Sequence, residues 1–384
     1  MIQRMLLNET SYFGPGAIEK IPDEVREHCW EKALIVTDRD LIRLGVAARV
    51  THILDENKIK YSLFDDIHQN PSIENVQHGV QTYHFVKADC MIAIGGGSVM
   101  DTAKAIGIIA NNPDYDDVLS LEGRPLTLNQ AVPIVAVPTT AGTAAEVTTS
   151  YTITDVKNRR KIVCNDPHNI PVVAIVDPDM MAGMPKDLTV ATGMDALTHA
   201  IEGYISKGAW PMSDIFTLKA VELIGRSLRK AALENDPEAR SSMALGQHLA
   251  GMGYSNAGRG VVHSLAHAVG GVYGTSHGLT NGVILPWAME FNAECTGEKY
   301  RDIAKAMGVH GTANMSPEEY RKAAVDAVRQ LGADLGVPAN LGALGVKAED
   351  VPFLAQQAVS DVCTADNPRE ASQAELEELL KAML

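Results

Sequence analysis

Metal-binding residue types recur at helical spacing in one stretch of the second half of the chain. Asp195 and His199 form one i,i+4 pair, and His263 and His267 form another. On a helix, residues four apart project from the same face, so each pair predicts a two-point clamp for a divalent ion. A further imidazole, His277, follows in the sequence TSHG. The spacing leaves open whether His267 or His277 completes the ligand set.

One carboxylate together with imidazoles is a ligand set between the hard oxygen ligands and the soft sulfur ligands. It suits iron(II) or zinc, whereas magnesium and calcium prefer oxygen ligands throughout. Pairs of this kind also occur on ordinary helix surfaces and as satisfied core residues. Here two pairs and a third His-Gly lie among apolar and small residues with few other charges. This combination favours a metal site.

The residues before this stretch alternate short apolar runs with amphipathic segments. After a strand-like N-terminal segment, the apolar runs predict strands at residues 33–38, 61–66, 90–98, 133–140 and 172–178. Runs that are apolar throughout are typical of a parallel sheet covered on both faces. The intervening helices are expected at residues 41–57, 73–85 and 99–111. Such alternation predicts a doubly wound α/β domain.

From Asp187 onward the pattern changes to helical periodicity, without a convincing strand. The predicted helices lie at residues 191–205, 213–233, 238–253, 300–307 and 317–335. Ser316, Pro317 and Glu319 mark a helix start, because they supply an N-cap, a proline in the first turn and a carboxylate at the third position. We therefore expect an α/β domain over residues 1–186 and an all-helical domain, carrying the metal clamps, over residues 187–384.

The overall composition limits the classes of function. The chain has 384 residues and a formal net charge of −15. This acidic balance, without a long basic block, argues against nucleic acid and anionic membranes as partners. No apolar run approaches the roughly 20 residues of a membrane span, and the N-terminus lacks a signal-peptide pattern. The five cysteines are scattered, which fits a reducing compartment, so a cytoplasmic location is expected.

A glycine-rich turn lies where a doubly wound sheet binds phosphate. Gly95, Gly96, Gly97 and Ser98 directly follow an apolar strand and open the next helix. Glycines let a phosphate approach the backbone closely, and a helix N-terminus offers unpaired N–H groups. The spacing differs from the usual G-x-G-x-x-G, and a simple tight turn is the alternative. The turn predicts a pyrophosphate site.

Other residues near strand ends support a dinucleotide site. Asp38 ends the first strand after the N-terminal segment, where a carboxylate can bind a ribose 2′-hydroxyl and would repel a 2′-phosphate. Its structural alternative is a helix N-cap. Thr139, Thr140 and Thr143 present hydroxyls after another strand. Lys161 could reach a phosphate or the nicotinamide ribose, although lone lysines are usually solvated.

With these motifs in place, the chain resembles the iron-containing (group III) alcohol dehydrogenases over essentially its whole length. Within that family it looks most like the lactaldehyde reductase (1,2-propanediol oxidoreductase) group. The stretches that carry the resemblance are RMLLNETSYFGPGAI, ALIVTD, AIGGGSVMDTAKAIG, VPTTAGTAAEVT, GMPKDLTVATGMDALTHAIEGYI, MALGQ, GVVHSLAH and DVCTADNPRE. The resemblance implies a dehydroquinate synthase-like fold.

The resemblance also implies roles that spacing cannot assign. It places iron(II), with zinc as a substitute, on Asp195, His199, His263 and His277, and it makes His267 a pocket imidazole, for which we expect a role in proton relay. NAD(H) is expected to contact Asp38, Asn70, Gly95, Gly96, Gly97, Ser98, Thr139, Thr140, Thr143, Ser150, Lys161 and Leu188. The substrate is expected to contact Ser150, Thr152, Tyr254 and Cys363.

The implied reaction is reversible hydride transfer between NADH and a small aldehyde, with lactaldehyde and 1,2-propanediol as the expected pair. Dehydrogenation of 1,3-propanediol, glycerol, ethanol or methanol remains an alternative. Ser150, Thr152 and Tyr254 add hydroxyls relative to the pattern of that group, Arg259 stands where leucine is usual, and Trp287 stands where histidine is common. The family usually forms homo-oligomers, so a homodimer is expected.

Two other classes of function fit parts of the pattern. A metal-dependent lyase of the dehydroquinate synthase type would share the two-domain layout, the NAD and the metal. Its anionic phosphorylated substrate requires several basic residues near the metal, and only Arg259 lies near GVVHSLAH. A noncatalytic NAD-binding scaffold would not need the complete ligand set. Both interpretations therefore rank below the dehydrogenase.

Overall fold

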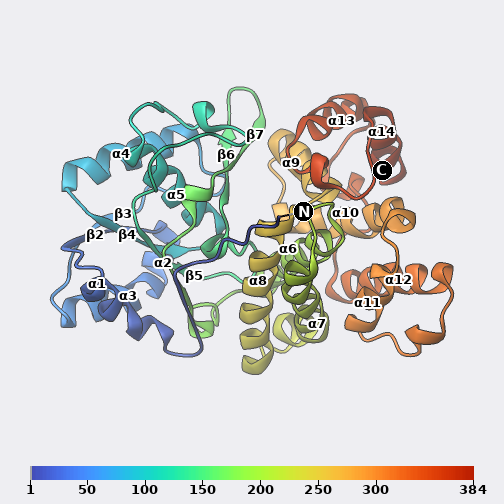
Figure 1. Ribbon diagram of the computed structural model, residues 1–384, viewed down its shortest axis with the longest axis horizontal. Coiled ribbons are helices and arrows are strands. Elements are labelled where there is room, and N and C mark those ends of the chain that lie inside the picture. Colours follow the sequence, from blue (N-terminus) through green and yellow to red (C-terminus); the bar gives the residue numbers. More distant parts are fainter. Residues whose placement is uncertain (1) are drawn as a thin grey trace. The chain divides into compact units, whose positions relative to one another are not determined.

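The computed structural model describes residues 2–384, and the chain divides into two compact units (Figure 1). The first unit runs to Thr140 and resumes at Ala144–Gly183. The second comprises Ala141–Thr143 and Met184–Leu384. The short segment Ala141–Thr143 therefore packs with the second unit, although the chain on both sides of it belongs to the first.

The first unit is built on a six-stranded sheet in which every neighbouring pair of strands is parallel. The strand order is β1-β8-β5-β4-β2-β3. The bounds are Thr10–Phe13 for β1, Lys32–Val36 for β2, Lys60–Phe64 for β3, Cys90–Gly95 for β4, Ile134–Pro138 for β5 and Val173–Val176 for β8. All residues of β4, β5 and β8 are buried, which explains their continuous apolar runs.

Helices cover both faces of this sheet. In Figure 1, α4 (Ile73–Val86) and α5 (Gly97–Asn111) lie on one face, and α1 (Ile21–Glu27) and α3 (Val46–Glu56) lie on the other. Alternate residues of the strands contribute to two separate cores, one with α4 and α5 and the other with α1 and α3. The prediction of a doubly wound α/β domain is confirmed.

The single helix expected over residues 41–57 was wrong. The structure has two helices there, α2 (Arg39–Arg43) and α3. Gly45 lies between them in the left-handed conformation, with φ of 74°. Glycine adopts this conformation without the steric cost of a Cβ, so it ends one helix and allows the chain to turn into the next.

A two-stranded antiparallel hairpin, which sequence analysis did not predict, also belongs to the first unit. It pairs β6 (Ser150–Asp155) with β7 (Arg160–Asn165). Ile153 and Ile162 face each other across the hairpin and are buried in the core that contains α5. The signal available in the sequence was the alternation of polar residues with Tyr151 and Ile153 along β6, and the structure buries these two side chains.

The second unit is helical throughout its described residues, with short 3-10 turns between the α-helices. The helices are α6 (Lys186–Ile205), α7 (Pro211–Leu233), α8 (Pro237–Ala257), α9 (Val261–Tyr273), α10 (His277–Asn292), α11 (Lys299–Ala306), α12 (Pro317–Leu335), α13 (Val351–Ser360) and α14 (Gln373–Ala382). The predicted start of α12 is confirmed, because the side chains of Ser316 and Glu319 each accept the other's backbone N–H.

Close approach between α6 and α10 positions the residues at the centre of this unit. A Cβ on Gly278, in the first turn of α10, would lie 2.1 Å from the carbonyl oxygen of Ala191 on α6. A Cβ on Gly193 would lie 2.2 Å from Leu228 of α7. Because real Cβ atoms do not approach so closely, these two glycines allow α6 to pack directly against its neighbours. The start of α10 is thereby held beside the middle of α6.

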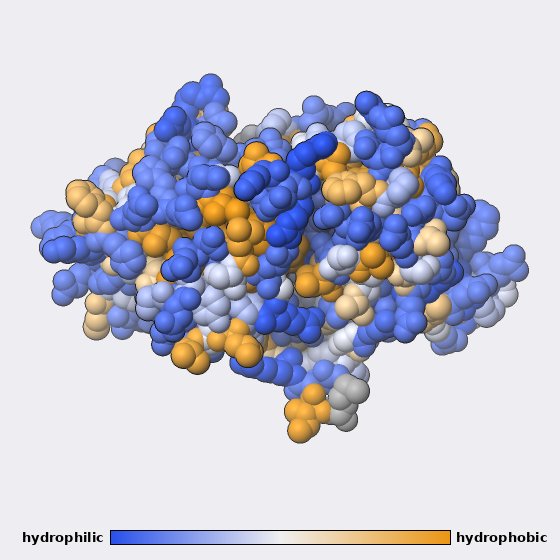
Figure 2. All heavy atoms as spheres, turned by 90° about the horizontal axis from the view of Figure 1, so that it is seen from above, coloured by the Kyte–Doolittle hydropathy of each residue, from blue (hydrophilic) through white to orange (hydrophobic). Residues whose placement is uncertain are grey.

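The molecular face in Figure 2 is mostly hydrophilic, with apolar residues in separate patches. Between residues 2 and 384, no helix combines the length and the apolar character that crossing a membrane requires.

Candidate metal centre and dinucleotide site

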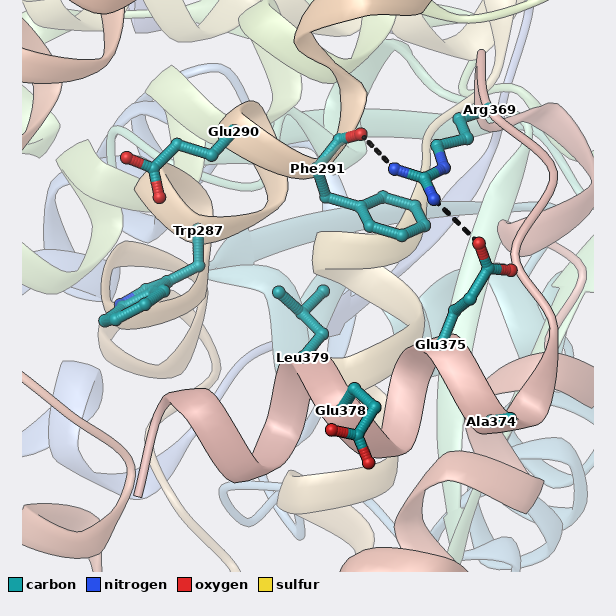
Figure 3. A pocket seen from close by; sticks show the side chains of 8 residues that line it. All are labelled: Trp287, Glu290, Phe291, Arg369, Ala374, Glu375, Glu378 and Leu379. Atoms are coloured by element: carbon teal, nitrogen blue, oxygen red, sulfur yellow. Dashed lines mark hydrogen bonds and ion pairs between the residues drawn. The ribbon is translucent and has the colours of Figure 1, made fainter.

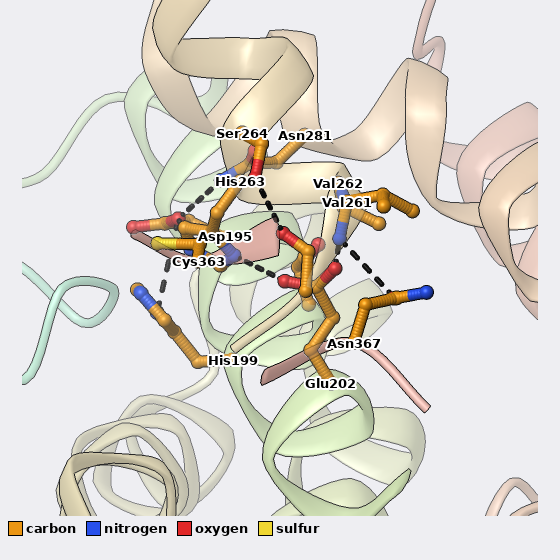
Figure 4. A network of polar contacts seen from close by, with 12 residues as sticks. Asp195, His199, Glu202, Val261, Val262, His263, Ser264, Asn281, Cys363 and Asn367 are labelled. Carbon is orange, nitrogen blue, oxygen red and sulfur yellow. Dashed lines mark hydrogen bonds and ion pairs between the residues drawn. The ribbon is translucent and has the colours of Figure 1, made fainter. Parts of the chain in front are cut away.

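Four potential metal ligands from three helices converge in the second unit. Asp195 and His199 come from α6, His263 from α9 and His277 from the start of α10. Oδ1 of Asp195 lies 3.8 Å from Nδ1 of His199 and 3.9 Å from Nε2 of His263 (Figure 4). The same oxygen lies 3.7 Å from Nε2 of His277. Two ligands at about 2.1 Å from one tetrahedral ion lie about 3.4 Å apart, so these separations are close to those of a shared ion.

The carboxylate and the two imidazoles from α9 and α10 form the tightest part of the cluster. The ligand atoms of Asp195, His263 and His277 all lie within 4.8 Å of one another. His199 adjoins this group through Asp195 and through its ring, whose centroid lies 4.4 Å from that of His263. The structure therefore brings together the four residues that the sequence resemblance assigned to the metal.

The buried nitrogen atoms of this cluster fit a cation. Asp195, His199 and His263 are buried, and no residue among 2–384 forms a hydrogen bond with Nδ1 of His199 or Nε2 of His263. A buried polar atom without a partner costs free energy, which a bond to a metal would remove. Burial also lowers the pKa of His199 and of His263 well below the usual value for histidine. Both imidazoles are therefore neutral, the form that binds a metal.

Glu202 orients His263 through the ring nitrogen that faces away from the cluster. Its Oε2 lies 2.6 Å from Nδ1 of His263, and its Oε1 accepts the backbone N–H of Val262 at 2.7 Å (Figure 4). Burial raises the pKa of Glu202 to about 7, although the N–H groups of Val262 and Gly260 oppose the rise. When the carboxylate accepts a hydrogen bond from Nδ1, Nε2 keeps its lone pair for a metal.

Glu202 also caps the N-terminus of α9, although it belongs to another helix. Gly260 is the N-cap residue of α9 and has no side chain to accept the first N–H groups of the helix. Glu202 supplies that acceptor from α6, so one carboxylate stabilises the start of α9 and the orientation of His263. Glu202 was not among the site residues expected from the sequence. The available signal was its i+7 spacing from Asp195, which places Asp195, His199 and Glu202 on one face of α6.

His267 lies beside the four ligands and pairs with a carboxylate. Its ring stacks on His277 with centroids 5.3 Å apart, and its Nδ1 lies 2.8 Å from Oδ2 of Asp361. Burial alone would raise the pKa of Asp361, but His267 and the N–H of Cys363 lower it to about 2. The carboxylate therefore accepts the hydrogen bond, and Nδ1 of His267 carries the proton. Asp361 was missed because no helical spacing connects it to His267.

Two predicted substrate contacts adjoin the cluster. Tyr254 stacks on His199, with centroids 4.1 Å apart and ring planes at 10°, and its hydroxyl donates to the carbonyl oxygen of Thr143 at 2.9 Å. Cys363 is buried and donates its backbone N–H to Asp361 at 2.8 Å. Burial raises the pKa of the Cys363 thiol, so the thiol stays protonated.

The other two predicted substrate contacts belong to the first unit. Ser150 and Thr152 lie on β6. The carbonyl oxygen of Ser150 accepts from Nζ of Lys104 at 3.0 Å, and the N–H of Thr152 donates to Oδ2 of Asp101 at 3.0 Å. Both contacts involve the backbone of β6. They therefore do not depend on the side chains of Ser150 and Thr152.

The glycine turn lies at the carboxyl end of β4, beside the end of β5. Gly96 is the N-cap of α5 and provides no side-chain cap for its first N–H groups. A Cβ on Gly95 would lie 2.4 Å from Val99, and one on Gly96 would lie 3.1 Å from Thr140. The N–H of Thr139 donates to the carbonyl oxygen of Gly95 at 3.0 Å. The turn and the two threonines therefore meet at one edge of the sheet, where doubly wound sheets bind ligands.

Asn70 and Lys161, distant in sequence, are hydrogen-bonded to each other. Nζ of Lys161 donates to Oδ1 of Asn70 and to Oγ1 of Thr154, each at 2.8 Å. Burial lowers the pKa of Lys161 to about 8. Lys161 is therefore not the solvated side chain that was the alternative interpretation of this residue.

The remaining residues predicted to contact the dinucleotide belong to different units of the chain. Asp38 is the N-cap of α2, where its Oδ1 accepts the N–H of Leu41 at 2.8 Å. Thr143 and Leu188 belong to the second unit, together with the metal ligands. The contacts predicted for NAD are thus divided between the two units.

Trp287 lies in a groove that contains none of the predicted metal or substrate residues. The groove runs between α10 and α14, and Figure 3 shows its lining: Trp287, Glu290, Phe291, Arg369, Ala374, Glu375, Glu378 and Leu379. The guanidinium of Arg369 lies 4.0 Å from the ring centroid of Phe291 and pairs with Glu375 at 2.7 Å. Trp287 lines this groove, and the guanidinium of Arg329 lies 5.4 Å from its ring centroid.

This combination, a glycine turn on a parallel α/β unit and a carboxylate–imidazole cluster in a helical unit, defines a class of metal-dependent dehydrogenase. A family model described as iron-containing alcohol dehydrogenase matches residues 8–178. A second, described as the C-terminal part of the Fe-containing alcohol dehydrogenase family, matches residues 189–384. The chain belongs to the iron-containing alcohol dehydrogenase family.

Individual relatives cover the chain from end to end. It is 53% identical over 379 residues to the lactaldehyde reductase of Escherichia coli (strain K12), with 99% of each chain covered. It is 39% identical to the NAD-dependent methanol dehydrogenase of Bacillus methanolicus, covering 97% of this chain and 98% of that one. The crystal structure of a 1,3-propanediol oxidoreductase matches with a TM-score of 0.96 at 38% identity and covers all of both chains. The family resemblance and the fold class read from the sequence are confirmed.

Proposed function

We propose that this protein is an iron-dependent, NAD(H)-linked alcohol dehydrogenase that reversibly reduces lactaldehyde to 1,2-propanediol. The observation that carries the proposal is the convergence of Asp195, His199, His263 and His277 in a chain that is 53% identical to a lactaldehyde reductase. Zinc is the expected substitute for iron(II), because imidazoles and a carboxylate bind both ions.

The proposal assigns dinucleotide binding to residues 1–186 and metal and substrate binding to residues 187–384. The uncapped N-terminus of α5 and the glycine turn are suited to the pyrophosphate. Asp38, Asn70 and Lys161 are assigned to the riboses and the nicotinamide end. These assignments are supported by the grouping of Gly95, Gly96, Thr139 and Thr140 at one sheet edge.

When bound, the divalent ion supplies Lewis acidity toward the carbonyl oxygen, and the dinucleotide supplies the hydride. The protein's own groups hold the ligand geometry and manage the proton. His267 is assigned to proton transfer at Nε2, because its Nδ1 is engaged by Asp361. The neutral thiol of Cys363 and the ring of Tyr254, which packs on His199, limit the space for the substrate.

The choice of aldehyde is the least constrained part of the proposal. The solved 1,3-propanediol oxidoreductase and the methanol dehydrogenase show that closely related chains act on other alcohols. Tyr254, Ser150 and Thr152 carry hydroxyls, and one methylene of difference between substrates is worth only about 1–3 kcal/mol. A second candidate function is therefore dehydrogenation of 1,3-propanediol or another short alcohol.

We further propose that the enzyme acts as a homodimer in the cytoplasm, without nucleic acid or membrane partners. The dimer is inferred from the family resemblance. The net charge of −15 and the scattered, free cysteines support the cytoplasmic location and the lack of nucleic acid and membrane partners. Light scattering after size-exclusion chromatography would test the dimer.

The reaction is tested by NADH oxidation with lactaldehyde, propanal, glyceraldehyde, glycolaldehyde and 3-hydroxypropanal, using iron-reconstituted protein. The expected result is the highest kcat/KM with lactaldehyde and a loss of turnover after chelation that iron(II) restores. A higher kcat/KM with 3-hydroxypropanal would favour the second candidate function. No oxidation with any aldehyde would overturn the dehydrogenase proposal.

Replacing Asp38 by serine is expected to raise kcat/KM with NADPH by about fivefold or more relative to NADH. The carboxylate repels a 2′-phosphate by at least about 1 kcal/mol at hydrogen-bonding range. Serine is also a good N-cap, so α2 keeps its cap while the charge is lost. An unchanged ratio of the two kcat/KM values would remove Asp38 from coenzyme selection.

A further inference from the structure

Arg259 is a cation near the metal cluster that forms no direct ion pair with any residue between 2 and 384, although the carboxylates of Asp361 and Glu202 act on it electrostatically. Its Cζ lies 5.5 Å from the ring centroid of Tyr254, the residue that stacks on His199. The residue is partly exposed, and its guanidinium N–H groups make no hydrogen bond, and no ion pair within 4.0 Å, to any residue between 2 and 384. A guanidinium carries five N–H donors, so these donors remain able to bind a ligand.

The backbone around Arg259 is held firmly in place. The residue occupies the short link between α8 and α9, flanked by Gly258 and Gly260. Gly258 donates its N–H to Tyr254 at 2.8 Å, and a Cβ on Gly258 would lie 2.6 Å from Asp366. Because this link is tightly packed, the backbone of Arg259 has a defined position near the metal cluster.

The carboxylates near Arg259 are already engaged. Asp361 and Glu202 interact with it electrostatically. The oxygens of Asp361 accept from His267 and from the N–H of Cys363. Those of Glu202 accept hydrogen bonds from α9. Neither carboxylate forms a direct ion pair with the guanidinium of Arg259. The N–H groups of Arg259 therefore remain able to bind another anion.

We propose that Arg259 forms an anion subsite, and that this enzyme reduces short aldehydes bearing a carboxylate or similar oxyanion in addition to lactaldehyde. The inference rests on the proposed dehydrogenase function. A guanidinium binds a carboxylate, sulfonate or phosphate through two parallel hydrogen bonds. A chain with a net charge of −15 repels such substrates at long range, so binding them requires a local cation of this kind.

The experiment compares substrates of similar length with and without the charge. Metal-loaded enzyme is assayed with NADH and either butanal or succinic semialdehyde, and the ratio of the two kcat/KM values is measured. Arg259→Leu is expected to lower this ratio, anionic over neutral, by about tenfold to a hundredfold, the range for a charge-assisted hydrogen bond. Arg259→Lys is expected to restore part of it, because an ammonium keeps the charge and lacks the two-pronged geometry.

The controls separate a local effect from a general one. Arg226→Leu removes the same charge from an exposed residue of the second unit that pairs with Glu222, and it should leave the ratio unchanged. The ratio is insensitive to partial unfolding, because both aldehydes report the same active fraction. Calorimetric titration with 4-hydroxybutyrate gives a second readout, with binding weakened in Arg259→Leu.

The two proposals fail in different ways. If the wild-type enzyme reduces butanal or lactaldehyde and Arg259→Leu leaves the ratio unchanged, the anion subsite is wrong and the dehydrogenase stands. If the wild-type enzyme oxidises NADH with no aldehyde, both the proposed function and the subsite are wrong.

Discussion

Replacing His263 by alanine is expected to remove bound metal and turnover together. Nε2 of His263 is buried, has no hydrogen-bond partner in residues 2–384 and lies 3.9 Å from Oδ1 of Asp195. Loss of this ligand should weaken metal binding by more than about a hundredfold, the upper end of the range for residues that only support a ligand. The measurements are metal content after gel filtration, by mass spectrometry, and kcat with lactaldehyde.

The matched variant is His267→Ala, one helical turn further along α9. His267 contacts His277 and Asp361, and we assign it to proton transfer. We therefore expect this variant to keep its metal and to slow the reaction by about 10²–10⁴-fold, the usual contribution of general acid–base catalysis. Equal loss of metal in the two variants would reject the distinction between ligand and proton-transfer residue.

Replacing Glu202 by leucine is expected to weaken metal binding although Glu202 is not a proposed ligand. Supporting carboxylates of this type typically contribute about 10–100-fold to metal affinity. The substitution also leaves the buried N–H of Val262 and Nδ1 of His263 without their acceptor, at a cost in unfolding free energy of about 1–3 kcal/mol. Competition titration against a chelator measures the affinity, and urea denaturation measures the stability.

Glu202→Gln should give an intermediate result. The amide oxygen can still accept one hydrogen bond, but the amide lacks the charge that favours a hydrogen bond from Nδ1. Glu222→Gln is the matched control, since Glu222 is partly exposed on α7 and pairs with Lys219. If Glu202→Leu binds metal as tightly as the wild type, His263 does not depend on Glu202 for its orientation.

Much of the fold was readable from local sequence. Continuous apolar runs predicted the inner strands because a parallel sheet buries both faces. Helical periodicity of apolar residues predicted the long helices of the second unit. The errors came where a local signal was weak. Gly45 divides one expected helix into α2 and α3, and the β6–β7 hairpin was overlooked although polar and apolar residues alternate along β6.

The metal site was predictable in part for the same reason. Asp195 and His199 share a helix face, as do His263 and His267, so each pair could be recognised from i,i+4 spacing alone. Spacing could not show which histidine completes the set, because His277 belongs to the next helix and its position depends on how α10 packs. The close approach of Gly278 to Ala191 brings His277 to Asp195.

The sequence by itself determined the residue types, their helical spacing and hence the chemistry: imidazoles and a carboxylate for a divalent ion, and a glycine turn for a phosphate. Only the tertiary structure decided which side chains support them. Glu202 on His263, Asp361 on His267 and Arg259 beside Tyr254 are contacts between different helices or loops. Such contacts depend on packing between segments distant in sequence, and no local periodicity encodes that packing.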